Sequence, residues 1–360
     1  MAKENYIVIL AGGGGTRLWP KSRVKTPKQF LKIINDKTLF QETISRISGS
    51  YPFSNIFVVA NKEFAPEIKK EVPSIPAENI LAEPSPKNTA AAIGFAAAKI
   101  ARKNPDAIIS TTAADHYVKG KEKFVKVLSV SQKAAASGDY LIIMGITPSH
   151  PHTGLGYIHK GSEKMDIEGV PVYEVKEFKE KPDEATALRY FESGDYFWNA
   201  NINTYKVSSI LDSIALYFPE LSKVLGKVRA GKSEKEIKSA WEKLSPEPID
   251  TAILEKAKNV LVVKAEFSWF DVGDWSSIHT ILSDEPELNI LLGEEPYTHL
   301  EVDTKGCLIH GTSKLVATVG LRDLVIVDTP DILMICPKNR AQEVKKLVEK
   351  LAEEKKHDFL

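Results

Sequence analysis

The sequence predicts a doubly wound α/β fold built on a mostly parallel sheet, followed by a small C-terminal β module and a terminal helix. Short apolar runs rich in β-branched residues alternate with helical stretches over most of the chain. Short strand patterns at close spacing then follow, and the chain ends in an amphipathic helical pattern.

The alternating part begins with residues 6–10, which are wholly apolar, as is typical of a parallel strand covered on both faces. The spacing of Leu39, Ile44 and Ile47 then predicts a helix over 38–47. Further strands are predicted at 55–60, 107–111, 140–144, 173–178 and 260–267, with helices at 89–102, 208–218 and 234–244. This order predicts βαβ units, whose ligands bind beyond the carboxyl ends of the strands.

The composition changes to acids and prolines around residues 284–296, which predicts a domain boundary there. Short strand patterns follow at 300–302, 307–309, 315–317, 324–327 and 332–335. Their close spacing predicts an all-β module in a stacked or helical arrangement, with a helix from about residue 341 to close the chain. We therefore expect two domains, residues 1–285 and 286–360.

Charge and composition limit the classes of partner. The 360 residues contain 48 Lys+Arg and 48 Asp+Glu, so the net charge is zero, which argues against binding to nucleic acid or to a membrane surface. No apolar run approaches transmembrane length, and two cysteines are too few for a disulfide framework. We expect a soluble, cytoplasmic protein.

A glycine-rich loop follows the first strand. Residues 10–17 read Leu-Ala-Gly-Gly-Gly-Gly-Thr-Arg, and the four glycines let backbone amides close on a bulky anion. Arg17 and Lys28 add positive charge, and no acidic residue lies between Ala11 and Asn35. Neither the P-loop nor the dinucleotide-binding pattern fits this spacing. The loop predicts a different kind of phosphate site, the plain alternative being a glycine turn beside surface cations.

The extended motif, Gly-Gly-x-Gly-x-Arg-Leu-Trp-Pro-x-Ser-Arg closed by Pro-Lys-Gln-Phe, resembles the signature of the sugar-nucleotide pyrophosphorylases. Among them it looks most like the mannose-1-phosphate guanylyltransferases, and the resemblance spans nearly the whole chain. It implies a Rossmann-like nucleotidyltransferase that transfers GMP from GTP to mannose 1-phosphate, giving GDP-mannose and pyrophosphate. It also implies Mg²⁺ as the cofactor, and a homodimer only as a family-level expectation.

In such a transfer the attacking phosphate oxygen is already ionised, so no nucleophilic side chain or general base is needed, and cations and a metal align the two polyanions and offset their repulsion. The resemblance gives Arg17 and Lys28 the role of holding the triphosphate. It assigns the metal to Asp115 of Ala-Asp-His and Asp271 of Trp-x-Asp-Val-Gly-x-Trp. Two carboxylates at strand ends suit Mg²⁺ shared with phosphate oxygens, although an aspartate after a strand is commonly a helix cap, and Asp274 lies close by.

The base is expected to contact residues 82–90, which resemble the family's Glu-Pro-x-x-Arg-Asn-Thr-Ala, with Lys87 replacing the arginine. A carboxylate accepts from both N1–H and N2–H₂ of guanine, so Glu83 is the candidate for base selection. The alternatives are that backbone groups read the base, or that Glu83 is merely solvated while Asn88 caps the following helix. The predicted nucleotide-binding residues are Leu10, Gly12, Gly13, Gly14, Gly15, Thr16, Glu83, Asn88 and Thr89.

Three segments, residues 153–158, 178–182 and 198–203, resemble the family's hexose-binding segments. The resemblance implies a close hexose approach at a glycine, a carboxylate that accepts from sugar hydroxyls, a lysine on the sugar phosphate and an asparagine towards the sugar. These are Gly156, Glu180, Lys181 and Asn199. The chain departs from the pattern at Asn201, in place of glycine, and at Asn203, in place of an aromatic residue. Asparagine tolerates a positive φ, but its side chain would narrow the hexose pocket, so mannose specificity depends on this segment.

Two other functions stay open. The same scaffold could use another hexose 1-phosphate or nucleoside triphosphate, or the chain could be a catalytically silent regulator that binds sugar nucleotides. The presence of Arg17 and Lys28 together with both aspartates weighs against silence. Separately, His150 and His152 form a His-x-His pattern that suggests a metal site, but no cluster of ligating residues lies nearby, which favours a polar loop.

Overall fold

The computed structural model describes residues 4–13, 15–293, 298–311 and 314–360, and the chain folds as two compact units. Unit 1 comprises Met1–Gly12, Ser45–Ala114 and Val118–Trp269, and unit 2 comprises Gly13–Ile44, Asp115–Tyr117 and Phe270–Leu360. The chain passes from one to the other within the glycine loop, within helix α1 (Leu39–Ile47), and at the short strands β5 (Tyr117–Lys119) and β11 (Ser268–Phe270). The predicted domains, residues 1–285 and 286–360, stay a prediction.

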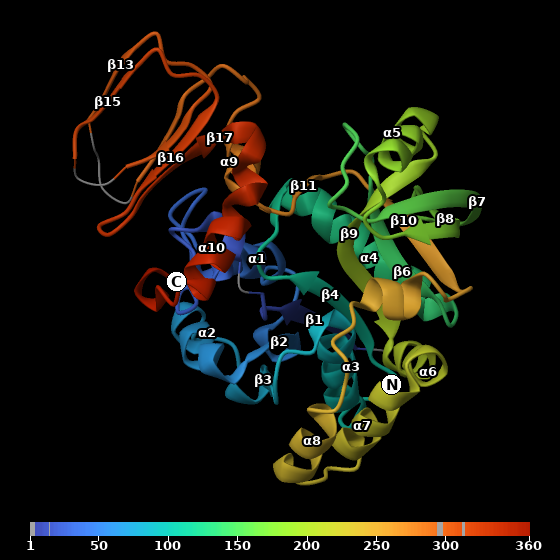
Figure 1. Ribbon diagram of the computed structural model, residues 1–360. Helices are drawn as coiled ribbons and strands as arrows, with labels where there is room; N and C mark the ends of the chain where they lie inside the picture. The colour runs from blue at the N-terminus through green and yellow to red at the C-terminus, as the bar shows by residue number, and fades with distance from the viewer. Residues whose placement is uncertain (1–3, 14, 294–297, 312–313) are drawn as a thin grey trace. The chain divides into compact units, whose positions relative to one another are not determined.

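Unit 1 is built on a nine-stranded sheet (Figure 1). In order across the sheet the strands are β3 (Ile80–Glu83), β2 (Ile56–Asn61), β1 (Asn5–Leu10), β4 (Ile108–Ala113), β9 (Tyr196–Lys206), β6 (Leu141–Ile146), β10 (Val260–Ala265), β8 (Val170–Lys179) and β7 (Tyr157–Ile167). Strand β9 pairs antiparallel with β4, β6 and β7, and β8 pairs antiparallel with β7 and β10. The remaining strands share one direction and the predicted α/β fold is confirmed, but five of the nine strand pairings are antiparallel, so the sheet is mixed.

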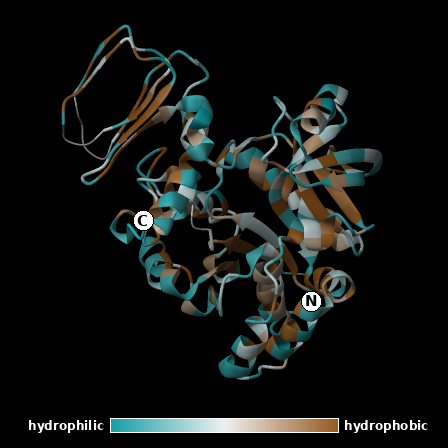
Figure 2. Cartoon of the chain, viewed as in Figure 1, coloured by the Kyte–Doolittle hydropathy of each residue, from teal (hydrophilic) through white to brown (hydrophobic). Residues whose placement is uncertain are grey.

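Helices cover both faces of this sheet, as a doubly wound fold requires. In β1, Tyr6 and Val8 belong to the buried cluster that also contains α3, α6 and α7, whereas the equally buried Ile7 and Ile9 point to the opposite face. Figure 2 shows hydrophobic residues gathered along the strands. The helices are α2 (Ala65–Glu71), α3 (Asn88–Ala101), α4 (Lys121–Ser137), α5 (Glu184–Ser193), α6 (Val207–Tyr217), α7 (Pro219–Arg229), α8 (Glu234–Trp241) and the π-helical turn η6 (Asp250–Leu254). Over the described part of the chain, no helix is long and apolar enough to cross a membrane.

The carboxyl ends of β1, β3 and β4 lie along one edge of the sheet, because β1 pairs in parallel with β2 and β4, and β2 pairs in parallel with β3. Leu10 is the last residue of β1 and is in register with Ala113 of β4. Glu83 is the last residue of β3, in register with Asn61. The sequence patterns did not predict β3, yet this short strand carries the candidate base-reading residue to the same edge.

Unit 2 contains the C-terminal β module and short helical turns. In the module, β12 (Ile290–Leu292), β14 (Leu308–His310) and β16 (Leu324–Asp328) pair in parallel, and β17 (Leu333–Pro337) adds antiparallel to β16. A second pair, β13 (His299–Val302) and β15 (Val316–Val319), is also parallel. Parallel pairing of alternate short strands, β12 with β14, β14 with β16 and β13 with β15, confirms the stacked module (Figure 1). Strand β12 lies inside the stretch that the sequence assigned to the domain boundary.

The core of unit 2 joins segments that are far apart in the sequence. Leu18 and Trp19, from the glycine-loop segment, share a buried cluster with Trp275 of α9 (Trp275–Leu282) and Val344 of the terminal helix α10 (Val344–Glu353). Trp275 Nε1 donates to the carbonyl of Trp19 at 3.0 Å, and Trp19 Nε1 donates to the carbonyl of Phe359 at 2.7 Å. The other helical turns are η1 (Thr16–Leu18), η2 (Lys28–Phe30), η7 (Lys338–Glu343) and η8 (His357–Phe359).

Candidate functional site

Lys28 connects the candidate phosphate and metal residues of unit 2. Its side chain is 10% exposed, and its Nζ lies 3.0 Å from Oδ2 of Asp115. The same ammonium donates to the backbone carbonyls of Asp271, at 3.0 Å, and Val272, at 2.9 Å. The Lys28 ammonium therefore contacts both Asp115 and the main chain of Asp271, although the three residues are distant in the sequence.

Asp115 is held in its ionised form. Burial raises the pKa of this carboxyl group, but the positive charges of Lys28 and His116, together with the hydrogen bond from Lys28, outweigh burial and hold the pKa below its ordinary value. The side chain is 25% exposed, which leaves it accessible to a ligand. Asp115 is thus a charged oxygen donor at neutral pH.

The turn at Asp271 is fixed by its neighbours. Val272 is buried and has a φ of 48°, a left-handed conformation that β-branched residues rarely adopt. Asp271 Oδ1 accepts from the backbone N–H of Gly273 at 2.9 Å. The nearby Asp274 caps helix α9 by accepting from the N–H groups of Ser276 and Ser277. The structure therefore gives Asp274 a structural role and leaves Asp271 as the better candidate ligand.

This donor set fits Mg²⁺. Among the residues that the structure describes, no group of three or more His, Cys, Asp or Glu is arranged to hold a metal ion. A cation held by Asp115 and Asp271 would complete its coordination with water and substrate oxygens. Magnesium commonly binds through one or two carboxylates and substrate phosphates, whereas structural zinc needs a full protein ligand set.

The glycine loop lies tightly against Lys28. Gly15 has a φ of 63°, and a Cβ added there would lie 2.3 Å from Cβ of Lys28. Ser22 Oγ donates to the carbonyl of Gly15 at 2.6 Å, which fixes the turn. Thr16 and Arg17 follow in η1 with exposed side chains, and Gly13 is also exposed. Gly14, also predicted to bind nucleotide, lies outside the described residues.

Glu83, in unit 1, is a buried carboxyl group. It is only 7% exposed, so the alternative of a merely solvated side chain is wrong. Burial raises its pKa to about 8, and in the described part of the structure Oε1 has no hydrogen-bond partner. A Cβ added to Gly12 would lie 3.8 Å from Oε2. A buried, unpaired carboxyl group beside bare backbone is suited to accept N–H groups from a ligand.

Asn88 does not cap α3 in the way the sequence suggested. The helix begins at Asn88 itself, which has a φ of 68°, and Asn88 Oδ1 accepts from the adjacent N–H of Thr89 at 2.8 Å. Thr89 Oγ1 accepts from the backbone N–H of Ile249 at 2.8 Å. The left-handed conformation at Asn88 marks the N-terminal end of α3. The residue before the helix, where a capping side chain normally lies, makes no capping hydrogen bond.

Three of the predicted sugar residues lie together in unit 1. A Cβ added to Gly156 would lie 2.5 Å from Oε2 of Glu180 and 3.4 Å from Cβ of Asn199. The backbone N–H of Asn199 also donates to the carbonyl of Gly156 at 2.8 Å. Lys181 follows with 62% of its side chain exposed, and its Nζ lies 2.9 Å from Oε1 of Glu180. The chain thus places an acidic and a basic side chain beside Gly156, whose lack of a side chain leaves room for a ligand.

The sequence patterns missed Asp250. It is 6% exposed, and its Oδ1 accepts from Nδ2 of Asn199 at 2.8 Å. Burial, followed by the negative charge of Glu180, raises its pKa to about 7. Asp250 begins a π-helical turn, a feature often found at functional sites. The only sequence signal was a lone acid within the apolar stretch 249–254.

The His-x-His pattern packs against an aromatic ring. The rings of His150 and His152 lie 5.0 and 6.1 Å from the ring of Trp198, measured between centroids. His152 Nδ1 accepts from the backbone N–H of Gly154 at 2.9 Å. Burial and the neighbouring His152 lower the pKa of His150. These contacts favour the polar-loop alternative over a metal site.

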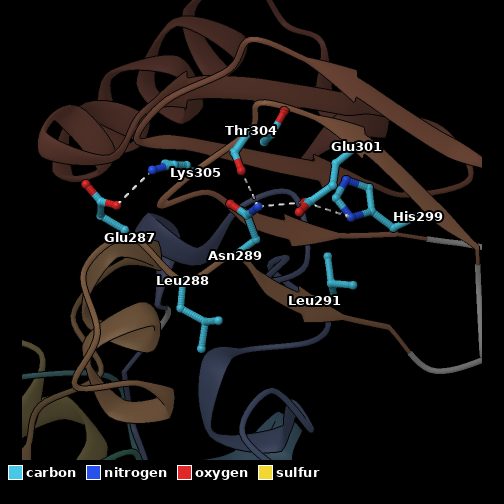
Figure 3. Close-up of a pocket in the computed structure, with 8 residues that line it drawn as sticks. All are labelled: Glu287, Leu288, Asn289, Leu291, His299, Glu301, Thr304 and Lys305. Atoms are coloured by element: carbon cyan, nitrogen blue, oxygen red, sulfur yellow. Dashed lines mark hydrogen bonds and ion pairs between the residues drawn. The ribbon is translucent and has the colours of Figure 1, made fainter.

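A separate concavity of about 550 Å³ lies in the C-terminal module, and no predicted site residue lines it (Figure 3). Its polar side chains pair with one another. Asn289 Nδ2 donates to Glu301 Oε2 at 2.6 Å, and Lys305 Nζ lies 3.2 Å from Glu287 Oε2. These pairs connect the segments around β12 and β13, so the described groups serve the structure of the module.

Comparison with known proteins identifies the family of the chain. Residues 6–287 match the nucleotidyl transferase family, and residues 298–351 match the MannoseP isomerase/GMP-like beta-helix domain. The chain is 33% identical to mannose-1-phosphate guanylyltransferase of Klebsiella pneumoniae, over 98% of this chain and 75% of that protein. It is 35% identical to alginate biosynthesis protein AlgA of Pseudomonas aeruginosa, over 96% and 71%.

A solved structure gives the same result. The crystal structure described as mannose-1-phosphate geranyltransferase from Thermus thermophilus is 30% identical, with a TM-score of 0.87 over 97% of this chain and 99% of that one. Together these matches show that the chain belongs to the mannose-1-phosphate guanylyltransferase family of nucleotidyl transferases.

Proposed function

We propose that this protein transfers GMP from GTP to mannose 1-phosphate, giving GDP-mannose and pyrophosphate, with Mg²⁺ as cofactor. Membership of the family supports the reaction class. The observation that carries the choice of GTP is the Glu83 carboxyl group, buried at a strand end and unpaired at Oε1. Guanine offers two neighbouring N–H donors to such a group.

The reaction needs alignment and charge compensation rather than a nucleophilic side chain. Arg17 holds phosphate oxygens through its planar guanidinium, and Lys28 adds a fixed ammonium. Asp115 and Asp271 are the residues that would hold Mg²⁺, and the ion would supply positive charge to the phosphates. On the sugar side, Glu180 accepts from hexose hydroxyls and Lys181 holds the sugar phosphate. The phosphate oxygen of the sugar then attacks the α-phosphorus in line, and pyrophosphate leaves.

Base selection follows from the pattern of donors. Selection rests on the ionised form of Glu83, whose raised pKa is lowered when two guanine N–H groups donate to it. Adenine presents an acceptor and a donor on the edge that would face Glu83, so the carboxylate would oppose the acceptor at N1. An unpaired polar group typically costs about 1–3 kcal/mol, and a charged group costs more, so we expect a preference for GTP of at least about tenfold.

The test is pyrophosphate release from a matrix of nucleoside triphosphates and hexose 1-phosphates. We expect turnover with GTP and mannose 1-phosphate in the presence of Mg²⁺. Faster turnover with another sugar or nucleotide would replace the proposed substrates on the same scaffold. Binding of sugar nucleotide without turnover of any pair would identify a regulatory relative instead.

Glu83→Gln tests the base reader within the same assay. The amide can donate as well as accept, so the GTP/ATP ratio of kcat/KM should narrow, mainly through weaker use of GTP. An unchanged ratio would transfer base reading to the backbone of the glycine loop.

A further inference from the structure

Asn201 replaces the glycine of the motif that the sequence resembles, and its backbone adopts the conformation that a glycine would favour. Its φ is 54°, which confirms that asparagine tolerates this position. The side chain is exposed, whereas that of Asn199, two residues earlier in β9, is only 1% exposed. Of these two asparagines, only Asn201, which departs from the pattern, is exposed.

The side-chain amide of Asn199 already makes its hydrogen bonds within the protein. Its Oδ1 accepts from the backbone N–H of Asn201 at 3.1 Å, so its other atom must be the Nδ2 donor. The two hydrogens of that Nδ2 are used by Asp250 Oδ1 at 2.8 Å and by Asn201 Oδ1 at 3.0 Å. Asn199 therefore has no free hydrogen to offer a ligand.

These hydrogen bonds also fix which way the Asn201 amide points. Since a backbone N–H can only donate, Asn199 must present Oδ1 to it and Nδ2 to Asn201. Asn201 must then turn Oδ1 towards Asn199, because two NH₂ groups cannot bond to each other. Among the described residues no hydrogen bond is made by Nδ2 of Asn201, so its two hydrogens are left for a ligand.

We propose that Asn201 is a hexose-binding residue that donates its amide N–H to one hydroxyl of the hexose 1-phosphate, and that Asn199 and Asp250 are positioning residues that fix its orientation. The assignment rests on the proposed function. It is supported by location, because Asn199 and Glu180 both lie beside Gly156. The chain thus adds a fixed donor to the hexose where the resembled motif has no side chain.

Asn201→Gly removes the donor at a position whose φ suits glycine. We expect the KM for mannose 1-phosphate to rise roughly threefold to tenfold, the usual range for one neutral hydrogen bond, with an unchanged KM for GTP. Lys355→Gly is the matched control, because Lys355 has a φ of 58° near the C-terminus, away from every predicted site residue in the sequence. It should change neither KM.

Mannose 1-phosphates that each lack one hydroxyl identify the contact. With the wild type, one of these analogues should lose the same factor in kcat/KM as the natural substrate loses with Asn201→Gly. With Asn201→Gly, that analogue and mannose 1-phosphate should be used equally well, since the same hydrogen bond is missing in both cases. Additive losses for every analogue would overturn the assignment.

Two isosteric changes test the orientation. Asn201→Asp replaces the donor with an acceptor, and Asn199→Asp leaves no donor for Oδ1 of Asn201, so its amide turns and presents oxygen to the sugar. In both variants the sugar hydroxyl would have to donate instead of accept, so a deoxyfluoro analogue at that carbon, which cannot donate, should lose more in kcat/KM than it does with the wild type. Asn201→Asp serves alone if the buried change at Asn199 prevents folding. An equal loss for that analogue in the wild type and in Asn201→Asp would overturn the proposal. A wild type without turnover on any hexose 1-phosphate would overturn the proposed function as well, which distinguishes the two failures.

Discussion

Glu83 and Asp115 are both carboxylic acids that follow parallel strands, yet their surroundings move the pKa in opposite directions. Burial without a nearby cation raises the pKa of Glu83 to about 8. Burial acts on Asp115 too, but the Lys28 ammonium at 3.0 Å outweighs it and lowers the pKa. The Glu83 carboxyl group is therefore suited to a neutral ligand that offers hydrogen-bond donors, whereas the Asp115 carboxylate is suited to cations.

Asp115→Asn and Asp271→Asn should each remove most pyrophosphate release at saturating Mg²⁺ while the protein stays folded. Asp115→Asn should lower the melting temperature more than Asp271→Asn, because it removes the counter-charge of Lys28. Each change deletes a charged ligand of a cation that assembles with the substrate. Asp274→Asn is the matched control in the same unit. Asparagine caps helices as well as aspartate does, so turnover should be kept. Near-normal turnover in either of the first two variants would remove that residue from the metal site.

Glu83→Gln should also change how stability depends on pH. Because the pKa of Glu83 is about 8 in the folded protein and near 4.5 in the unfolded chain, folding is unaffected below pH 4.5, and stability is lost as pH rises towards 8. Glutamine does not ionise, so Glu83→Gln should gain about 1–3 kcal/mol over wild type by pH 8.5 and nothing at pH 4.5.

Urea unfolding across this pH range measures the difference, with the exposed Glu78→Gln as control. An equal offset at all pH values, or a gain at low pH, would show that Glu83 is not a buried acid of raised pKa.

At the scale of elements, the candidate phosphate site depends on two turns with unusual backbone conformations. One is the glycine loop, where Gly15 has a φ of 63° and packs against Lys28. The other follows β11, where Val272 has a φ of 48° and offers its carbonyl to the same lysine. Such conformations persist when the surrounding packing and hydrogen bonds determine them, and they are common at functional sites.

Gly15→Ala should destabilise the protein by more than about 2 kcal/mol, because alanine is disfavoured at positive φ and its Cβ would meet Lys28. Gly226→Ala is the matched control. Gly226 lies in the exposed face of α7 with no atom near the added Cβ, so that change should gain about 0.5–1 kcal/mol. Denaturant midpoints give both values. A neutral Gly15→Ala would show that the loop relaxes easily and does not hold Lys28 in place.

At the scale of the whole molecule, the terminal helix belongs to the same core as the glycine-loop segment. Val344 is buried in the cluster that contains Leu18 and Trp19, and α10 contacts η1, which carries Arg17. The tail of the chain therefore supports a segment that lies more than 300 residues earlier.

Removal of residues 344–360 should abolish turnover, although every predicted site residue is retained, because it exposes the buried face of Leu18 and Trp19 beside Arg17. Removal of residues 357–360 alone deletes one hydrogen bond to Trp19 and should cost only about 1 kcal/mol. Pyrophosphate release and near-ultraviolet circular dichroism of both proteins test this. Full turnover after the longer deletion would show that α10 does not support the loop.

Much of the fold was predictable because hydrophobic periodicity is a local property. The wholly apolar runs at 6–10 and 140–144 are strands β1 and β6, and the pattern at 208–218 is helix α6 within one residue. Strand β3 was missed because it has only four residues and ends in a glutamate, and β12 was missed because acids and prolines surround it. Strand β3 pairs with β2, and β12 pairs with β14. A local sequence pattern cannot indicate such pairing.

The sequence by itself determined the fold class, the family resemblance and the types of residue available for phosphate, metal and sugar, because motifs and periodicity are written in neighbouring residues. Only the tertiary structure decided the state of those residues. It paired Lys28 with Asp115, left Glu83 buried without a partner at Oε1, and used both hydrogens of Asn199 inside the protein. These outcomes depend on burial and on partners dozens to hundreds of residues away, and such electrostatic and hydrogen-bonding environments exist only once the chain has folded.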